Sequence, residues 1–122
     1  MPVCDLSIPA DTEQVRVARL VACAAARRTG MTEDDVDEVR LAVGEAVGRA
    51  VVRHRRAECA EPVLMRMVDD PTAFRVEVQD RAAELVDDDF GMAMAVITGL
   101  VPDAQLVAGP QGGQVLRMAW VV

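Results

Sequence analysis

Aromatic residues are scarce in this sequence of 122 residues, which contains one tryptophan, two phenylalanines and no tyrosine. The core must therefore be aliphatic, with seven methionines available to fill irregular gaps. Cysteine is also rare: Cys4, Cys23 and Cys59 are odd in number, and neither a CxxC pair nor a Cys/His ligand spacing occurs. That pattern argues against a zinc site or a disulfide framework and favours reduced thiols, as in a cytoplasmic protein.

Positive charge and long apolar runs are also in short supply. The formal net charge is −7, which argues against nucleic acid as a partner because nucleic-acid-binding proteins present basic surfaces. No apolar run approaches the ~18 residues of a membrane-spanning helix, and no basic-then-apolar leader opens the chain. We expect a cytoplasmic protein whose partners are proteins or a small ligand, with no nucleic acid and no membrane. The basic clusters Arg27-Arg28 and Arg53–Arg56 are interpreted as solvated helix ends, where cations complement the helix dipole.

Hydrophobic periodicity predicts the order of the secondary structure. Alternating apolar residues predict strands at 3–8, 63–68, 73–79, 105–108 and 115–121. Three- and four-residue spacing predicts helices at 15–29, 32–55 and 91–101. The apolar residues expected to face the core from the first and third helices are Val17, Leu20, Val21, Ala24, Met92, Met94 and Val96.

Turn residues predict how the strands are joined. Asp69–Thr72 and Gly112-Gly113 are expected to close hairpins, which indicates a mostly antiparallel, mixed sheet. Three amphipathic helices would cover one face of that sheet. The sequence thus predicts an α+β two-layer sandwich formed by a single domain over residues 1–122.

The segment Arg40–Val52 carries the residues on which the function depends. Glu45 and Arg49 are four residues apart, so they share a face of the predicted helix. We expect them to form an ion pair, which is worth about 0.3–0.5 kcal/mol if it is exposed.

In order along the chain, this and other segments resemble the anti-sigma factor serine-kinase group of the GHKL (histidine kinase-like) ATPase superfamily. The first nucleotide motif of that group has a glutamate followed four positions later by asparagine. The second is a strand that ends in Asp-x-Gly-x-Gly, and the third is Gly-x-Gly before a helix. The matching segments are the opening strand ending at Ile8-Pro-Ala10, Leu41–Val51, Val76–Glu84, Gly91–Leu100 and the closing strand Gly112–Trp120.

The resemblance implies roles for individual residues. Glu45 corresponds to the general base of the group, and Asp80 corresponds to the aspartate that accepts a hydrogen bond from the adenine amino group. Asp80 is equally well explained as a turn former at the end of a strand. Arg49, Asp80 and Gly91 would line the nucleotide pocket.

The departures from the family pattern matter more than the matches. Arg49 replaces the asparagine that offers oxygen to magnesium, whereas a guanidinium has only donors and a fixed positive charge. The glycines of the second and third motifs are replaced by Ala82, Glu84 and Ala93, which removes room for close backbone approach. Only Leu85–Phe90 separate these motifs, so the ATP lid is shortened. We therefore expect a vestigial pocket with no metal and no cofactor.

Three functions remain open. We prefer a degenerate, pseudokinase-like anti-sigma regulator in which Glu45 and Arg49 fill the former cavity. It would dock, as a homodimer, with a sigma factor and/or an anti-anti-sigma (STAS-type) protein, and Arg16 and Arg19 on the first helix are candidate partner-binding residues. The second is an active serine kinase that uses ATP with Mg²⁺, possible if Arg49 contacts phosphate in place of the metal. The third is a homo-oligomeric scaffold without a sigma partner.

Overall fold

The structure is a computed structural model that describes residues 2–83 and 91–122. Within them, five strands form one sheet in the order β1-β2-β3-β5-β4, and each neighbouring pair is antiparallel. The strands are β1 (Val3–Ile8), β2 (Val63–Asp70), β3 (Ala73–Gln79), β4 (Gln105–Ala108) and β5 (Gln114–Val121). The helices are α1 (Val15–Arg28), α2 (Glu33–Arg56) and α3 (Gly91–Leu100), with a single 3₁₀ turn, η1 (Thr12–Gln14), before α1.

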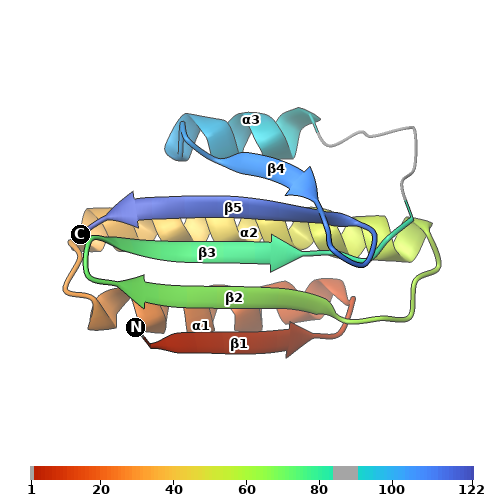
Figure 1. Cartoon of the computed structure of the whole chain (residues 1–122), viewed down its shortest axis with the longest axis horizontal. Helices are drawn as coiled ribbons and strands as arrows, with labels where there is room; N and C mark the ends of the chain where they lie inside the picture. The colour runs from red at the N-terminus through yellow and green to blue at the C-terminus, as the bar shows by residue number, and fades with distance from the viewer. Residues whose placement is uncertain (1, 84–90) are drawn as a thin grey trace.

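The helices and the sheet form two layers. Figure 1 shows α1 and α2 side by side behind the sheet, and α3 beside the edge strand β4. The long helix α2 is central to the helical layer because both α1 and α3 pack against it. The predicted α+β sandwich is confirmed, and the described strand pairs are antiparallel throughout.

Local sequence explains why α2 forms where it does. Thr32 caps its N-terminus by accepting a hydrogen bond from the Asp35 amide at 3.2 Å, and acidic residues fill the first turn where the helix dipole favours them. An apolar stripe at three- and four-residue spacing is buried along this helix. Its members are Val36, Val39, Val43, Ala46, Val47, Ala50 and Val51.

Helix α1 faces the core with a different side from the one predicted. Val17 is 43% exposed, Leu20 is 59% exposed and Ala24 is also exposed. Of the predicted residues, Val21 is half-buried and packs against the core, as expected. The buried residues are instead Ala18, Ala22, Cys23 and Ala26. Small side chains on this face let α1 approach α2 closely, and the larger apolar residues are left on the surface. The predicted packing of α3 is also wrong for Met92, which is 77% exposed, because Ile97 is the buried residue of that helix.

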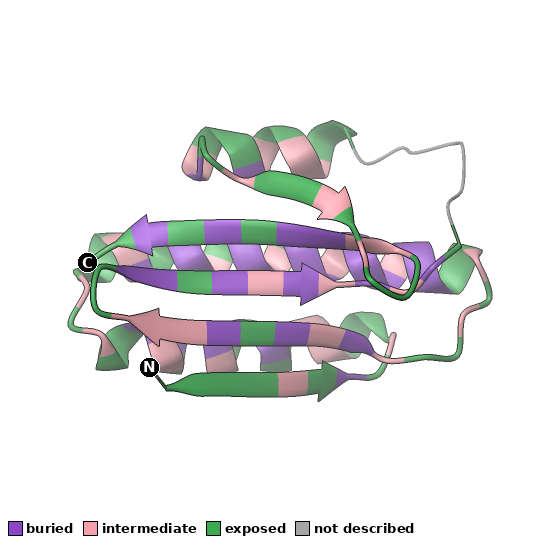
Figure 2. Cartoon of the chain, in the orientation of Figure 1, coloured by how far each residue is buried: buried purple, intermediate pink, exposed green. Residues whose placement is uncertain are grey.

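The two faces of the sheet differ in chemistry. Side chains alternate between the buried and exposed faces, as Figure 2 shows along β3 and β5. The inner face carries the largest apolar residues, including Phe74 and Trp120, whose ring centroids lie 6.3 Å apart. On the outer face, Arg66 pairs with Asp5 at 2.8 Å, and these hydrogen bonds hold the pKa of Asp5 below its ordinary value.

The turn between β4 and β5 packs against the residue that follows β3. Gly112 and Gly113 both have positive φ, which confirms the predicted turn. A Cβ atom on Gly113 would lie 2.1 Å from the carbonyl oxygen of Asp80. The turn therefore requires glycine at position 113 for two reasons, conformation and space.

Replacement of Gly113 by alanine should destabilise the protein by more than about 2 kcal/mol, because the strained φ and the overlap with the Asp80 backbone add together. Urea unfolding measures the free energy. The matched control is Gly48→Ala on α2, where the new Cβ meets nothing within 4 Å. That control should stabilise the helix by about 0.5–1 kcal/mol. Equal effects of the two substitutions would contradict this account of the turn.

Candidate functional site

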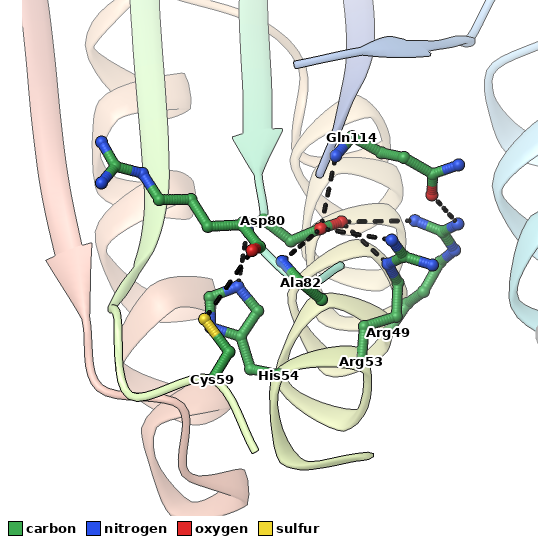
Figure 3. Close-up of polar contacts among 8 residues, drawn as sticks. Arg49, Arg53, His54, Cys59, Asp80, Ala82 and Gln114 are labelled. Atoms are coloured by element: carbon green, nitrogen blue, oxygen red, sulfur yellow. Dashed lines mark hydrogen bonds and ion pairs between the residues drawn. The ribbon is translucent and has the colours of Figure 1, made fainter. Parts of the chain in front are cut away.

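Two arginines of α2 converge on one carboxylate at the end of β3. Arg49 and Arg53 are one helical turn apart, so their side chains leave the same face of α2. Both point toward Asp80, as Figure 3 shows. All three side chains are buried, with relative exposures of 4% for Arg49, 2% for Arg53 and 2% for Asp80. The cluster therefore lies in a region of low solvent screening, where charge–charge interactions are strong.

The Asp80 carboxylate is held by donors from several segments of the chain. Arg53 grips both of its oxygens: Nε donates to Oδ2 at 3.0 Å and Nη2 donates to Oδ1 at 3.4 Å. Backbone amides of Ala82 and Gln114 also donate to Oδ1, at 3.2 and 3.3 Å. Asp80 is thus both a turn former, through Ala82, and a buried ion-pair partner of α2.

Arg49 makes a different set of contacts from the one predicted. Its Nη2 donates to Oε1 of Gln114 at 2.5 Å, and its Nη1 lies 4.0 Å from Oδ2 of Asp80. The expected partner Glu45 is exposed on α2. Both of these contacts of Arg49 are to buried groups, which attract a guanidinium more strongly than a carboxylate in water does. The Glu45–Arg49 pair stays a prediction.

The third motif contributes less to this cluster. Gly91 is exposed at the start of α3, and a Cβ atom added there would meet nothing within 4 Å. Ala82 is fully buried and Ala93 is partly buried. Glu84 and the short lid Leu85–Phe90 lie outside the described residues.

The last turn of α2 contains functional groups that the sequence interpretation missed. Arg53 and His54 are buried, although the cluster Arg53–Arg56 was expected to be solvated; Arg55 and Arg56 are exposed, as predicted. Both buried residues continue the apolar stripe of α2, three positions after Ala50 and Val51, and this spacing could have revealed them.

His54 connects two loops to the C-terminal end of α2 through hydrogen bonds of its imidazole ring. The Arg81 amide donates to its Nε2 at 2.8 Å, so the ring proton lies on Nδ1, which is 2.8 Å from the Glu61 carbonyl oxygen and donates to it. Nearby, the Cys59 thiol donates to the Arg81 carbonyl oxygen at 3.8 Å. These contacts fix the segment that carries Asp80 against α2.

The cluster around Asp80 contains many N–H donors and few oxygen atoms that could bind a cation. Within residues 2–83 and 91–122, no group of three or more His, Cys, Asp and Glu residues is placed to hold a metal ion. Magnesium prefers oxygen ligands, and the Asp80 oxygens already accept bonds from guanidinium and amide groups. The described residues therefore do not fit a magnesium ion.

The two candidate partner-binding residues lie elsewhere. Arg16 and Arg19 are exposed on α1 and line a groove of ≈ 220 Å³ between α1 and α2. The other lining residues are Leu20, Cys23, Arg27 and Arg40. The groove shares no residue with the Asp80 cluster, so the two sites can be altered separately. No helix of the described chain is long and apolar enough to cross a bilayer.

Removal of the His54 imidazole should destabilise the protein. His54→Ala removes a fully buried side chain together with its two part-buried hydrogen bonds, to the Arg81 amide and the Glu61 carbonyl, at a cost of about 2–5 kcal/mol. Chemical denaturation measures the loss. Arg55→Ala, an exposed substitution on the same helical turn, is the control and should change stability by less than about 0.5 kcal/mol. Similar values for both variants would show that the His54 bonds do not hold these loops.

Comparisons with known proteins agree with the geometry. Residues 8–120 match the family described as the histidine kinase-like ATPase domain. Serine-protein kinase RsbW of Halalkalibacterium halodurans is 30% identical over 109 residues, which cover 88% of this chain and 65% of that protein. Serine-protein kinase RsbW of Bacillus velezensis is 40% identical over 47 residues, which cover 38% of this chain and 29% of that protein.

A solved structure shows the same fold. The structure of the RsbU and RsbW domains of Rv1364c from Mycobacterium tuberculosis has a TM-score of 0.75 and 19% sequence identity, and the match covers 98% of this chain but 32% of that one. This chain therefore spans only part of each relative: about two thirds of the Halalkalibacterium protein and about a third of the others. The resemblance inferred from the nucleotide motifs is confirmed at the level of the family. The chain belongs to the histidine kinase-like ATPase domain family.

Proposed function

We propose that this chain is a cytoplasmic regulatory domain that works by docking to protein partners in a sigma-factor partner switch and does not transfer phosphate. Its matched relatives are named serine-protein kinases, which supports the regulatory setting. The observation that carries the proposal is the burial of Arg49 at the position where the resemblance implies a magnesium-binding asparagine. There it bonds to Gln114 and lies near Asp80.

Electrostatics favours the loss of the metal. Two unit charges about 4 Å apart interact by about 4 kcal/mol at an effective dielectric near 20, and a divalent ion doubles the figure. A guanidinium cannot be deprotonated to relieve this repulsion, and it has no acceptor to offer a cation. Because Arg49 is 4% exposed, water screens its charge poorly. A magnesium ion bound beside it would therefore be strongly opposed.

The position of Glu45 supports the same conclusion. The resemblance gives this glutamate the role of a general base, which requires a reacting group and a metal nearby. Glu45 is exposed on α2, whereas the polar cluster around Asp80 is buried. We propose that a vestigial nucleotide site with no catalytic role is formed by Glu45, Arg49, Asp80 and Gly91.

The groove between α1 and α2 is the proposed docking surface. It gathers arginines on a chain of net charge −7, which favours a partner segment with acidic side chains. Leu20, 59% exposed, supplies an apolar anchor within the same groove. We propose that a sigma factor or a STAS-type antagonist occupies this surface, and that the exposed apolar stripe of α1 also supports a homodimer.

A second candidate function is an active serine kinase, favoured by the names of the relatives and by the retention of Glu45 and Asp80. Calorimetric titration with ATP and Mg²⁺ separates the two. A docking domain should show no binding at nucleotide concentrations up to about 1 mM. Its Kd for ATP would then be above about 1 mM, which corresponds to a binding free energy weaker than about 4 kcal/mol. Magnesium-dependent binding near micromolar affinity, with phosphate transfer to a STAS-type protein, would establish the kinase instead.

The docking surface is tested by charge reversal. Arg16→Glu with Arg19→Glu should weaken binding to a purified sigma factor or STAS-type antagonist by about tenfold or more, because the groove changes sign where an acidic segment would lie. Surface plasmon resonance at two salt concentrations measures the effect. Arg55→Glu on α2, also exposed but outside the groove, is the matched control. Binding unaffected by the double reversal would place the partner elsewhere, and self-association without any partner binding would favour a scaffold.

A further inference from the structure

The acceptor atoms of Asp80 are already used by the chain itself. A carboxylate offers about four lone-pair sites. Oδ1 accepts from Arg53 Nη2 and from the amides of Ala82 and Gln114, while Oδ2 accepts from Arg53 Nε and lies 4.0 Å from Arg49 Nη1. Oδ1 is therefore fully used, and Oδ2 keeps one lone pair, with Arg49 Nη1 4.0 Å away from that oxygen. Since the adenine amino group would need an acceptor here, it would have to compete with Arg53 and Arg49 for this carboxylate.

Arg53 is the main occupant of this carboxylate. Its two-pronged contact is the fork-to-fork geometry that makes arginine–carboxylate pairs both strong and directional. Arg49, by contrast, directs Nη2 to the Gln114 side chain. The base end and the metal end of the former pocket are therefore closed by different residues of α2.

Neighbouring contacts prevent Asp80 from turning away from α2. Its amide donates to the Gln114 carbonyl oxygen at 2.9 Å, and the next amide, of Arg81, is held by His54. Gly113 packs so closely on the Asp80 carbonyl that a single Cβ atom would overlap it. With the backbone fixed on both sides, the carboxylate stays directed at Arg53.

We propose that Arg53 substitutes for the nucleotide base. It binds the Asp80 carboxylate, to which adenine would otherwise bond, and so holds the site in its folded arrangement without a ligand. As a result, partner binding does not depend on nucleotide. This inference rests on the proposed function, which supplies both the role of Asp80 and the existence of a partner. It goes further in naming Arg53, a residue outside the nucleotide motifs. It also implies that substitution of Arg49 alone should not make Asp80 accessible to adenine.

Adenosine is the appropriate probe, because it carries the base without phosphate or metal. Arg53→Ala should lower the melting temperature, and millimolar adenosine should raise it again by filling the vacated space and donating to Asp80. Inosine, which presents a carbonyl oxygen in place of the amino group, should give no such rise. Adenosine should bind Arg53→Ala about tenfold or more tightly than the unchanged protein, as measured by NMR titration.

Two control variants and one alternative test variant complete the experiment. Arg49→Asn and Arg55→Ala should both stay insensitive to adenosine, the first because Arg53 still occupies Asp80 and the second because it is exposed. If Arg53→Ala does not fold, Arg53→Met keeps the apolar stem of the side chain while it frees the same two oxygens. Folded Arg53→Ala or Arg53→Met protein that ignores adenosine, or unchanged protein that binds adenosine equally well, would overturn the proposal.

Measuring partner affinity with and without nucleotide distinguishes failure of this inference from failure of the proposed function. Affinity of the unchanged protein for its sigma factor or STAS-type antagonist should be the same with and without 5 mM ATP and Mg²⁺, within about twofold. A nucleotide effect larger than that would refute nucleotide independence while leaving docking intact. Absence of any partner binding would refute the docking function, and the adenosine experiments would still decide the role of Arg53.

Discussion

The buried ion pair between Arg53 and Asp80 is the constraint on which the rest of the site depends. It joins the C-terminal half of α2 to the end of β3, with Nε and Oδ2 3.0 Å apart and both side chains almost fully buried. Replacing such a pair by apolar residues is often neutral or stabilising, so its presence says little about net stability. Breaking it from one side is costly, because an unpaired charge stays buried. We infer that the pair favours one arrangement of α2, the Asp80 turn and the β4–β5 hairpin over others.

That arrangement keeps apart two regions that a nucleotide-binding regulator would couple. The polar cluster lies between α2 and the end of β3, whereas the arginine-lined groove lies between α1 and α2. In a domain that responds to nucleotide, the first region would change shape and alter the second. We propose that side chains of the domain itself occupy the first region here, so that α2 would present the same surface to a partner in every nucleotide state. Such an arrangement would be a route from an enzyme fold to a constitutive docking module.

The sequence was sufficient for most of the fold and insufficient for the site. Strand β3, at 73–79, and the buried stripe of α2 follow directly from periodicity and from nearby turn and capping residues. The face of α1 could not be chosen in the same way, because apolar residues occur on more than one side of that helix and only packing against α2 selects the alanine-rich face. Arg53 was misjudged for a related reason: its partner, Asp80, is 27 residues away in sequence, and helix-dipole preferences describe only local surroundings. Long-range polar pairing is the information that local pattern does not carry.

We propose that guanidinium groups of the chain fill the place of a nucleotide, and NMR of the arginine Nε–H groups can detect whether they do. Buried, hydrogen-bonded Nε–H groups exchange slowly with water and give resolved resonances. We expect a protected Arg53 signal that neither moves nor loses protection when ATP and Mg²⁺ are added in excess. A signal that shifts and becomes exchangeable as nucleotide saturates the protein would show that the ion pair opens for ligand, and would contradict the account.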